Sequence, residues 1–309
     1  MPNWRRIGVM EHRALRHDDH MSSCILRALN QGRRETASLA EWLAVDMLPL
    51  LQIVTSQLLP NQSRSLMKEA RELGSLGITK RLEGIGRILH EVFADRSGRI
   101  ELRKTIGSHV SDVVRQWAVY MVAADCRLEL DARLRALRTF AADRNMSVRE
   151  CAWMAFRPFL IPDLEAGISL LKPWTLDPDP YIRRFAIEVT RPRSVWGRHI
   201  VALKQNPSQG IVLLDPVRSD PSRYVQRAVA NWLNDASKST GSWVVDVCGR
   251  WTRDSPTPET GWIVRRALRT LTRENGTVTF VLPPRRVKDI NSGRKGNRLH
   301  VLSEGAFTA

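Results

Sequence analysis

Two glutamates, Glu150 and Glu188, are the side chains whose type and surroundings most suggest chemistry, because each stands in a row of arginines. A surface that only binds phosphate would disfavour a negative charge at either position. A carboxylate fixed there could stabilise positive charge that develops on a bound molecule during a reaction. The structural alternative is that each glutamate forms a salt bridge with a nearby arginine, such as Arg157 or Arg191.

The polar residues around these glutamates follow a helical spacing. Positions two, six and nine after an apolar anchor fall on one face of a helix, since their separations are four and three residues. Guanidinium groups in a row suit phosphate, although a solvated face with ion pairs such as Arg184 with Glu188 is the alternative. The residues that we expect to bind a phosphate backbone are Arg157, Arg184, Arg191, Arg193, Arg227, Asn231, Asn234, Lys238 and Arg266.

Tryptophans are frequent near these positions. The chain has 10 of them, and Trp117, Trp153, Trp196 and Trp232 lie on or directly after the segments that carry the polar residues. A tryptophan usually packs in a core. Trp153 and Trp196 flank the two acids in the sequence, and we therefore expect these two to face a bound nucleotide.

The segments that carry these residues are repeats of one phrase. It reads VVRQWAVYMV from Val113, VRECAWMAF from Val148, IRRFAIEVT from Ile182, VQRAVANWL from Val225 and VRRALRTL from Val264. Subtraction of these positions gives spacings of 35, 34, 43 and 39 residues. Periods of this size are typical of helical solenoids, most closely the HEAT and armadillo class.

Each phrase is predicted to be the second helix of a two-helix unit. The lead-ins ADRNMS, DPDPY and DPSRY supply turn and helix N-cap residues. Second helices commonly line the concave surface of a solenoid. The predicted fold is therefore an all-α, HEAT-like helical repeat solenoid, an ARM-type superhelix with a concave basic face.

The ends of the chain differ from its middle. We expect an N-terminal helical extension over residues 1–30, the repeat domain over 31–275, and a basic, flexible tail over 276–309. The alternative for the tail is the first strand of a further domain. Early in the repeat domain, Thr36 or Ser38 is predicted to cap a helix, with Glu41 completing a capping box with Ser38.

The charge of the chain narrows its partners. Lys and Arg number 48 against 32 Asp and Glu, which gives a formal net charge of +16 and favours a polyanion: DNA, RNA or an anionic membrane. Membrane is the weakest of these, because no run of 18 apolar residues occurs. The N-terminus shows no apolar signal region, so we expect a cytoplasmic protein. The four cysteines have no metal-ligand spacing, and we expect reduced thiols, no metal and no cofactor.

Several longer phrases resemble a known family. VRECAWMAFRPFL, IRRFAIEVTRPRSVW, YVQRAVANWLNDASK and TGWIVRRALRTL resemble the bacterial AlkC/AlkD-type DNA glycosylases, closer to AlkC, and GRRETASLAEWLAVDM resembles the AlkC opening. The resemblance covers about residues 30–275. Some AlkC-type proteins add an immunoglobulin-like domain after the repeats, and this chain has no room there for a complete one.

The resemblance implies a cationic cradle around duplex DNA and the removal of cationic N-alkylated bases, such as 3-methyladenine, in base excision repair without base flipping. Glu150 and Glu188 match the family's functional glutamates, and Trp196 matches the aromatic after the second R-P pair. An N3-alkylated purine leaves as a neutral base, so the carboxylate need only stabilise oxocarbenium character on the sugar and orient the water. The implied enzyme is a monomer that needs no cofactor and associates with the nucleoid when bound to DNA.

Two other functions remain open at this point. The chain could be a non-catalytic relative that binds DNA through the same cradle. It could instead be a HEAT scaffold for acidic protein partners, but that function gives no reason for two acids among the arginines.

Overall fold

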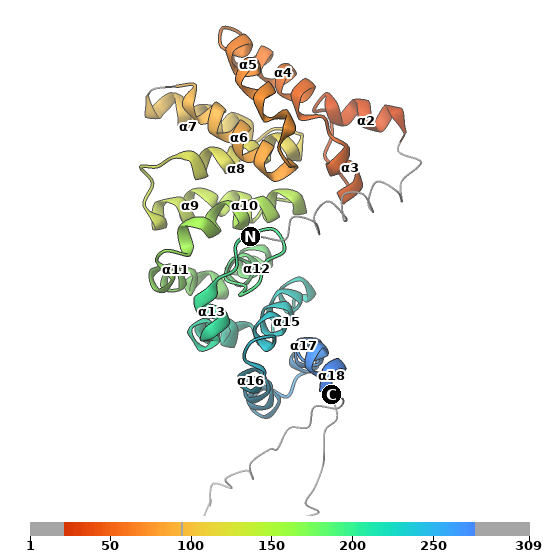
Figure 1. Cartoon of the computed structure of the whole chain (residues 1–309), viewed down its shortest axis with the longest axis vertical. Helices are drawn as coiled ribbons and strands as arrows, with labels where there is room; N and C mark the ends of the chain where they lie inside the picture. The colour runs from red at the N-terminus through yellow and green to blue at the C-terminus, as the bar shows by residue number, and fades with distance from the viewer. Residues whose placement is uncertain (1–21, 94, 276–309) are drawn as a thin grey trace, which may run out of the picture. The chain divides into compact units, whose positions relative to one another are not determined.

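The computed structural model describes residues 22–93 and 95–275, and throughout these ranges the regular elements are α-helices and short 3-10 helices (Figure 1). The predicted all-α repeat fold is confirmed. Residues 23–30 of the expected extension form a helix, whereas residues 1–21 and the predicted tail over 276–309 lie outside the described residues. No helix in the described ranges is long and apolar enough to cross a bilayer.

The chain divides into two compact units. The first runs to Trp174 and also contains Trp196–Arg198; the second contains Thr175–Val195 and continues from His199. The predicted boundaries of a single repeat domain, 31–275, stay a prediction.

The first unit consists of paired helices. Its second helices α6, α8 and α10 pack side by side, with α7 against α8 and α9 against α10 (Figure 1). The helices of this unit are α2 (Ser23–Asn30), α3 (Leu39–Ala44), α4 (Met47–Leu58), α5 (Ser63–Glu72), α6 (Ile78–Glu91), α7 (Arg96–Gly107), α8 (Asp112–Ala124), α9 (Leu130–Ala141), α10 (Met146–Leu160) and α11 (Leu164–Leu171).

The second unit repeats this plan, but the segment before α15 is divided into the short helices α13 and α14. Its second helices are α12, α15 and α17, and α15 packs against both of the others. The helices are α12 (Pro180–Val189), α13 (Val201–Gln205), α14 (Ile211–Leu214), α15 (Arg223–Ser237), α16 (Gly241–Asp254), α17 (Pro258–Ala267) and α18 (Arg269–Asn275).

Close packing between second helices depends on small residues. A Cβ on Gly86 of α6 would overlap the Cβ of Tyr120 on α8, so only glycine allows this approach. Trp117 of α8 and Trp232 of α15 are fully buried and fill the cores of their units. Of the four cysteines, Cys151 and Cys248 are buried and Cys24 and Cys126 are exposed, and all four are free thiols.

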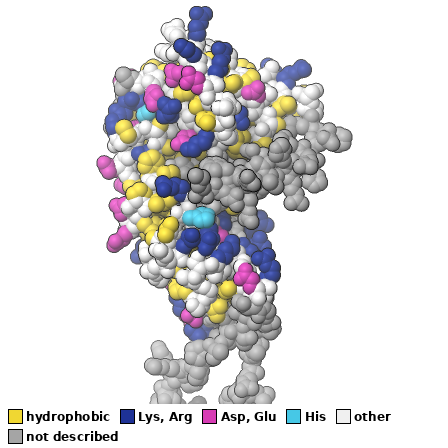
Figure 2. Space-filling model, in the orientation of Figure 1, with side chains coloured by type: hydrophobic (Ala, Val, Ile, Leu, Met, Phe, Trp, Pro, Cys, Tyr) yellow, Lys and Arg dark blue, Asp and Glu magenta, His cyan; other side chains and the backbone are white. Residues whose placement is uncertain are grey.

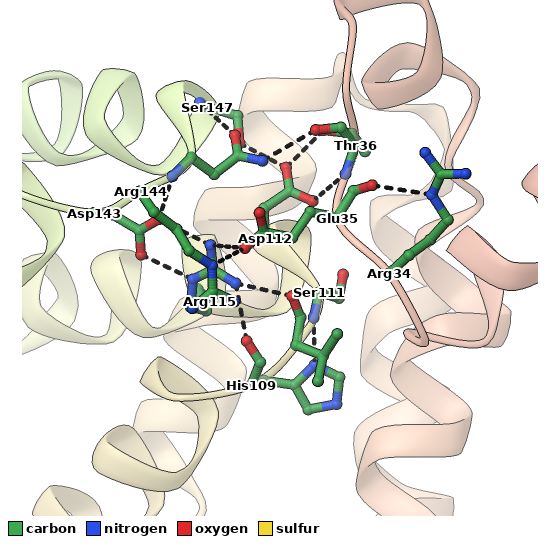
Figure 3. Close-up of polar contacts among 12 residues, drawn as sticks. Arg34, Glu35, Thr36, His109, Ser111, Asp112, Arg115, Asp143, Arg144 and Ser147 are labelled. Carbon is green, nitrogen blue, oxygen red and sulfur yellow. Dashed lines mark hydrogen bonds and ion pairs between the residues drawn. The ribbon is translucent and has the colours of Figure 1, made fainter.

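The sequence offered two residues, Thr36 and Ser38, as the cap of one helix, and the structure distinguishes between them. The Ser38 hydroxyl accepts a hydrogen bond from the Glu41 N–H, and the Glu41 carboxylate accepts one from the Ala37 N–H. Ser38 is therefore the cap. Thr36 instead donates to the Asp112 carboxylate on α8 through both its N–H and its hydroxyl, at 2.9 and 2.7 Å (Figure 3).

The turns before the second helices share one local structure. The carboxylates of three turn aspartates each accept a hydrogen bond from the N–H two residues further on: Asp143 from Asn145, Asp177 from Asp179 and Asp220 from Ser222. In the turn before α8, His109 Nδ1 accepts from Ser111 N–H in the same way. Such Asx-type turns lead the chain into the next helix.

Six residues after each of these acceptors, a long polar side chain donates back to a carbonyl of the same turn. These residues are Arg115, Arg149, Arg183 and Gln226. Two of the arginines also pair with the aspartate of the following turn: Arg115 with Asp143 and Arg183 with Asp220. The ion pairs therefore connect successive repeats.

This contact corrects the register of the first phrase. Arg115 is equivalent to Arg149, so Val114 rather than Val113 is the counterpart of Val148, and the first two spacings are both 34 residues by subtraction. Val113 and Val114 are both buried, which is why the sequence pattern could not distinguish them. Position two of this repeat is then Gln116.

Candidate nucleic-acid interface

Helix α10 carries the first predicted acid, Glu150. The helix begins at Asn145, whose side chain accepts the Ser147 N–H. Glu150 is half-buried, and its Oε2 accepts a hydrogen bond of 2.8 Å from Nε1 of Trp153, one turn further on. Trp153 is 2% exposed, so the structure does not support its expected stacking on a nucleotide. Its indole orients the Glu150 carboxylate instead.

Arg157 lies one turn beyond Trp153 and is also buried, with 1% of its surface exposed. Its Nε donates to the carbonyl oxygen of Arg198 at 2.8 Å. This contact ties the segment Trp196–Arg198 to α10 within the first unit. The burial of Arg157 does not support the predicted phosphate contact. It favours a role in holding the segment that carries Trp196, which is itself half-buried.

Helix α12 carries the second predicted acid, Glu188, which is 5% exposed. Asp179 caps this helix, and Pro180 occupies its first position, where no backbone donor is needed. One Glu188 oxygen lies 2.6 Å from the Arg191 guanidinium and the other lies 3.6 Å from that of Arg184. The salt-bridge alternative from the sequence is therefore present at Glu188.

The structure adds an acid that the sequence reasoning missed, Asp235 of α15. Its carboxylate lies 2.7 Å from Arg191 and 3.5 Å from Lys238, and its backbone carbonyl accepts a hydrogen bond from Arg193. Asp235 lies ten residues after the anchor of its repeat, where the repeats anchored at Val148 and Ile182 carry the proline of an R-P pair. That substitution of a charge for proline was the available signal.

The resulting charge network consists of Arg184, Glu188, Arg191, Asp235 and Lys238. It contains three cations and two acids, hence a net charge of +1. Burial alone would lower the pKa of Arg191, but the charges of Glu188 and Asp235 outweigh burial and raise this pKa. The Arg184 guanidinium also lies 4.4 Å from the centroid of the Tyr224 ring, a cation–π contact.

The other predicted phosphate-binding residues differ in exposure. Arg227, Lys238 and Arg266 are exposed, and Asn231 is half-buried. Asn234 is 2% exposed, and its Nδ2 donates to the Ala267 carbonyl and the Thr270 hydroxyl. The burial of Asn234 does not support a phosphate contact, because both donor contacts serve to hold α15 against the following helices.

Figure 2 shows Lys and Arg side chains distributed along the visible face, with fewer Asp and Glu between them. Within the described ranges, no group of three His, Cys, Asp or Glu side chains lies in an arrangement that could hold a metal ion. The chemistry that the arrangement offers is electrostatic: oriented carboxylates among guanidinium groups.

Comparison with solved structures identifies the class of fold. The alkylpurine DNA glycosylase AlkC of Pseudomonas fluorescens, bound to DNA containing an abasic site analog, aligns with a TM-score of 0.63 and 27% identity, over 72% of this chain and 62% of that chain. AlkD2 of Streptococcus mutans aligns with a TM-score of 0.53 and 20% identity, over 67% of this chain and 98% of that chain. The chain therefore has the AlkC/AlkD-type fold, with more similarity to this AlkC than to this AlkD2.

Comparison by sequence is less extensive. The Bacillus subtilis protein YhaZ is 40% identical over 128 residues, which cover 41% of this chain and 35% of YhaZ. The chain thus matches about a third of YhaZ and about three fifths of the AlkC structure. No family model matches the chain.

Proposed function

We propose that the chain is a monofunctional DNA glycosylase acting in DNA alkylation repair. It hydrolyses the N-glycosidic bond of cationic N-alkylated bases, such as 3-methyladenine, in duplex DNA, without base flipping and as a cytoplasmic monomer. The observation that carries the proposal is Glu150, a half-buried carboxylate oriented by the Trp153 indole in a fold shared with a glycosylase bound to DNA.

Glu150 is assigned to the sugar of the damaged nucleotide. A cationic base departs as a neutral molecule, so no general acid is required. Positive charge then develops on the deoxyribose, and a carboxylate already oriented by a hydrogen bond stabilises it without reorganising. The same carboxylate can orient the attacking water. Trp196 is assigned to the lesion or its sugar, where an indole face attracts a cation.

Glu188 is assigned a different part in the same reaction. Both of its oxygens are occupied by guanidinium groups and it is 5% exposed. It therefore acts as a positioning residue that directs Arg184 and Arg191 towards backbone phosphates. Arg193 and the exposed Lys238 extend this basic surface, which binds duplex DNA by neutralising phosphate charge.

The test is the release of free 3-methyladenine from methylated duplex DNA under single-turnover conditions. Glu150→Gln is expected to slow release by about 100-fold with DNA affinity unchanged, because it removes charge stabilisation at the transition state. Glu188→Gln is expected to slow release by about tenfold, because Arg184 and Arg191 lose the carboxylate that orients them. Glu165→Gln, an exposed glutamate on α11, is the matched control and should behave as wild type.

Full release by the Glu150→Gln, Glu188→Gln double variant would contradict both assignments. Tight DNA binding without any release by the wild-type protein would favour the second candidate, a non-catalytic DNA-binding protein. The paired state of Glu188 is the observation that favours this candidate, since a salt-bridged acid needs no catalytic role.

A further inference from the structure

The outward surface of α15 and α17 has a register that two contacts define. Near the start of α15, the Arg223 guanidinium lies 4.3 Å from the centroid of the Trp262 ring on α17. Two turns later, Asn231 Oδ1 accepts a hydrogen bond of 3.1 Å from Arg269. The partners are separated by 39 and 38 residues by subtraction, and α15 packs against both α17, which carries Trp262, and α18, which carries Arg269.

This register places two arginines opposite each other. Arg227 follows Arg223 by four residues, and Arg266 follows Trp262 by four residues, so both are one helical turn further along the same face. Both side chains are exposed. Along the helices, Arg227 and Arg266 therefore lie at a level between the Arg223–Trp262 contact and the Asn231–Arg269 contact.

The four arginines of this surface have no acidic partner. Among the described residues, no carboxylate lies within ion-pair distance of Arg223, Arg227, Arg266 or Arg269. This contrasts with the charge network of α12 and α15, where every cation is paired. Burial lowers the pKa of Arg269, and the charge of Arg266 lowers it further, as expected where like charges crowd together.

Exposed arginines are usually solvated, but three of these, Arg223, Arg266 and Arg269, contact neutral groups. The Arg266 guanidinium lies 5.7 Å from the Trp262 centroid, so this indole attracts both Arg223 and Arg266. Arg269 donates to the Arg266 carbonyl as well as to Asn231. The guanidinium groups are thus oriented in advance, which reduces the entropy lost when an anion binds.

We propose that this surface binds two successive phosphates of one DNA strand, with Arg227 and Arg266 on one phosphate and Arg269 on the next. On α15 the two levels are marked by Arg227 and Asn231, which are about 6 Å apart along the helix axis, close to the separation of neighbouring phosphates on a strand. Trp262 and Asn231 are positioning residues. The proposal rests on the proposed function, because it takes DNA as the partner. It adds a sequence-independent anchor that is separate from both glutamates.

The test is the salt dependence of affinity for an undamaged duplex, measured by fluorescence anisotropy. Each lost phosphate contact lowers the slope of log K against log salt by about 0.9, and because Arg227 and Arg266 share one phosphate, Arg227→Gln with Arg266→Gln should lower it by about 0.9. Arg265→Gln is the control for loss of an exposed arginine on α17: it removes one charge, against two in the double variant, from a neighbouring position that faces another direction. Its slope should equal that of the wild type.

A second variant separates positioning from charge. Trp262→Leu keeps all four arginines, so the slope should stay unchanged while affinity falls about threefold to tenfold. A double variant with the wild-type slope would overturn the proposed anchor and leave the glycosylase proposal intact, provided that wild-type protein binds DNA and releases 3-methyladenine. Wild-type protein that binds no duplex at any salt concentration would overturn both.

Discussion

Two arginines, one in each unit, hold a pair of carboxylates, but their surroundings differ. In the first unit, Arg115 lies 2.6 Å from Glu35 and 2.8 Å from Asp143, and it also donates to the carbonyls of His109 and Val110 (Figure 3). All five of its N–H donors are thereby used. In the second unit, Arg191 lies between Glu188 and Asp235.

The difference lies in net charge and exposure. Arg115 and Arg144 balance Glu35 and Asp143, so the cluster in the first unit is neutral, and the Arg115 side chain is 3% exposed. The network around Arg191 has a net charge of +1, and the Arg191 side chain is 17% exposed. An arginine between two carboxylates thus forms a buried, neutral cluster in the first unit and a more exposed cluster with a net positive charge in the second unit.

The largest expected effect on stability is that of breaking the neutral cluster around Arg115. Arg115→Met should lower the free energy of unfolding by about 3–5 kcal/mol, because it leaves the largely buried Asp143 carboxylate and two turn carbonyls without the arginine, although Glu35 keeps Arg144. Arg191→Met should cost about 1–2 kcal/mol, because Glu188 keeps Arg184 and Asp235 keeps Lys238. Urea denaturation of both variants measures the difference. Equal losses of unfolding free energy would contradict this prediction and show that the two arginines contribute equally to stability.

A smaller effect is expected from a change at Asp235, which pairs with both Arg191 and Lys238. Asp235→Asn removes one negative charge from the network, so non-specific DNA affinity should rise about twofold to threefold. The release of 3-methyladenine should nevertheless slow by about threefold to tenfold, because Arg191 loses one of the groups that orient it. Asp246→Asn, an exposed aspartate on α16, provides the control for charge alone and should leave the release rate unchanged.

The smallest effect concerns acid stability of the first unit. His109 Nδ1 accepts the Ser111 N–H, and burial, aided by the charge of Arg115, lowers the pKa of His109 below 6.5. The native state therefore binds this proton less readily than the unfolded state. Stability should be complete above pH 6.5 and fall by about 1 kcal/mol as the pH drops towards the lowered pKa, as the hydrogen bond is lost.

His109→Asn keeps an acceptor without a titrating group. Comparison of its unfolding free energy with that of the wild type between pH 7.5 and 5 isolates the contribution of His109, since other acid-sensitive groups such as His90 are present in both proteins. Identical pH profiles of the two proteins would show that His109 does not contribute to the loss of stability at low pH.

The sequence predicted the fold better than the site. Repeated anchors and turn residues indicated the helices, because burial of one face imposes a period that is visible in the residue types. The register of α8 was wrong by one residue, since Val113 and Val114 satisfy the core equally well. The burial of Trp153, Arg157 and Asn234 depends on how neighbouring segments cover each face, which spacing along one helix does not encode.

Charge pairing was also only partly visible. The pairing of Arg184 with Glu188 follows from their spacing, whereas the contact of Arg191 with Asp235 joins residues 44 positions apart. The roles of Glu150 and Trp196 remain predictions that the excision assay tests.

The ion pairs between turns also bear on how such a chain can lengthen. Each pair takes its arginine from one repeat and its aspartate from the next, as in Arg115 with Asp143 and Arg183 with Asp220. A tandem duplication of one 34-residue block brings both halves of a new pair, so an added copy joins the series without any compensating mutation. Gln226 keeps the turn contact but carries no charge, so it cannot pass the ion pair on to the following turn. Within the described residues the ion pairs between turns therefore do not continue past Gln226, so a copy duplicated from the repeats before α15 is one that brings such a pair with it.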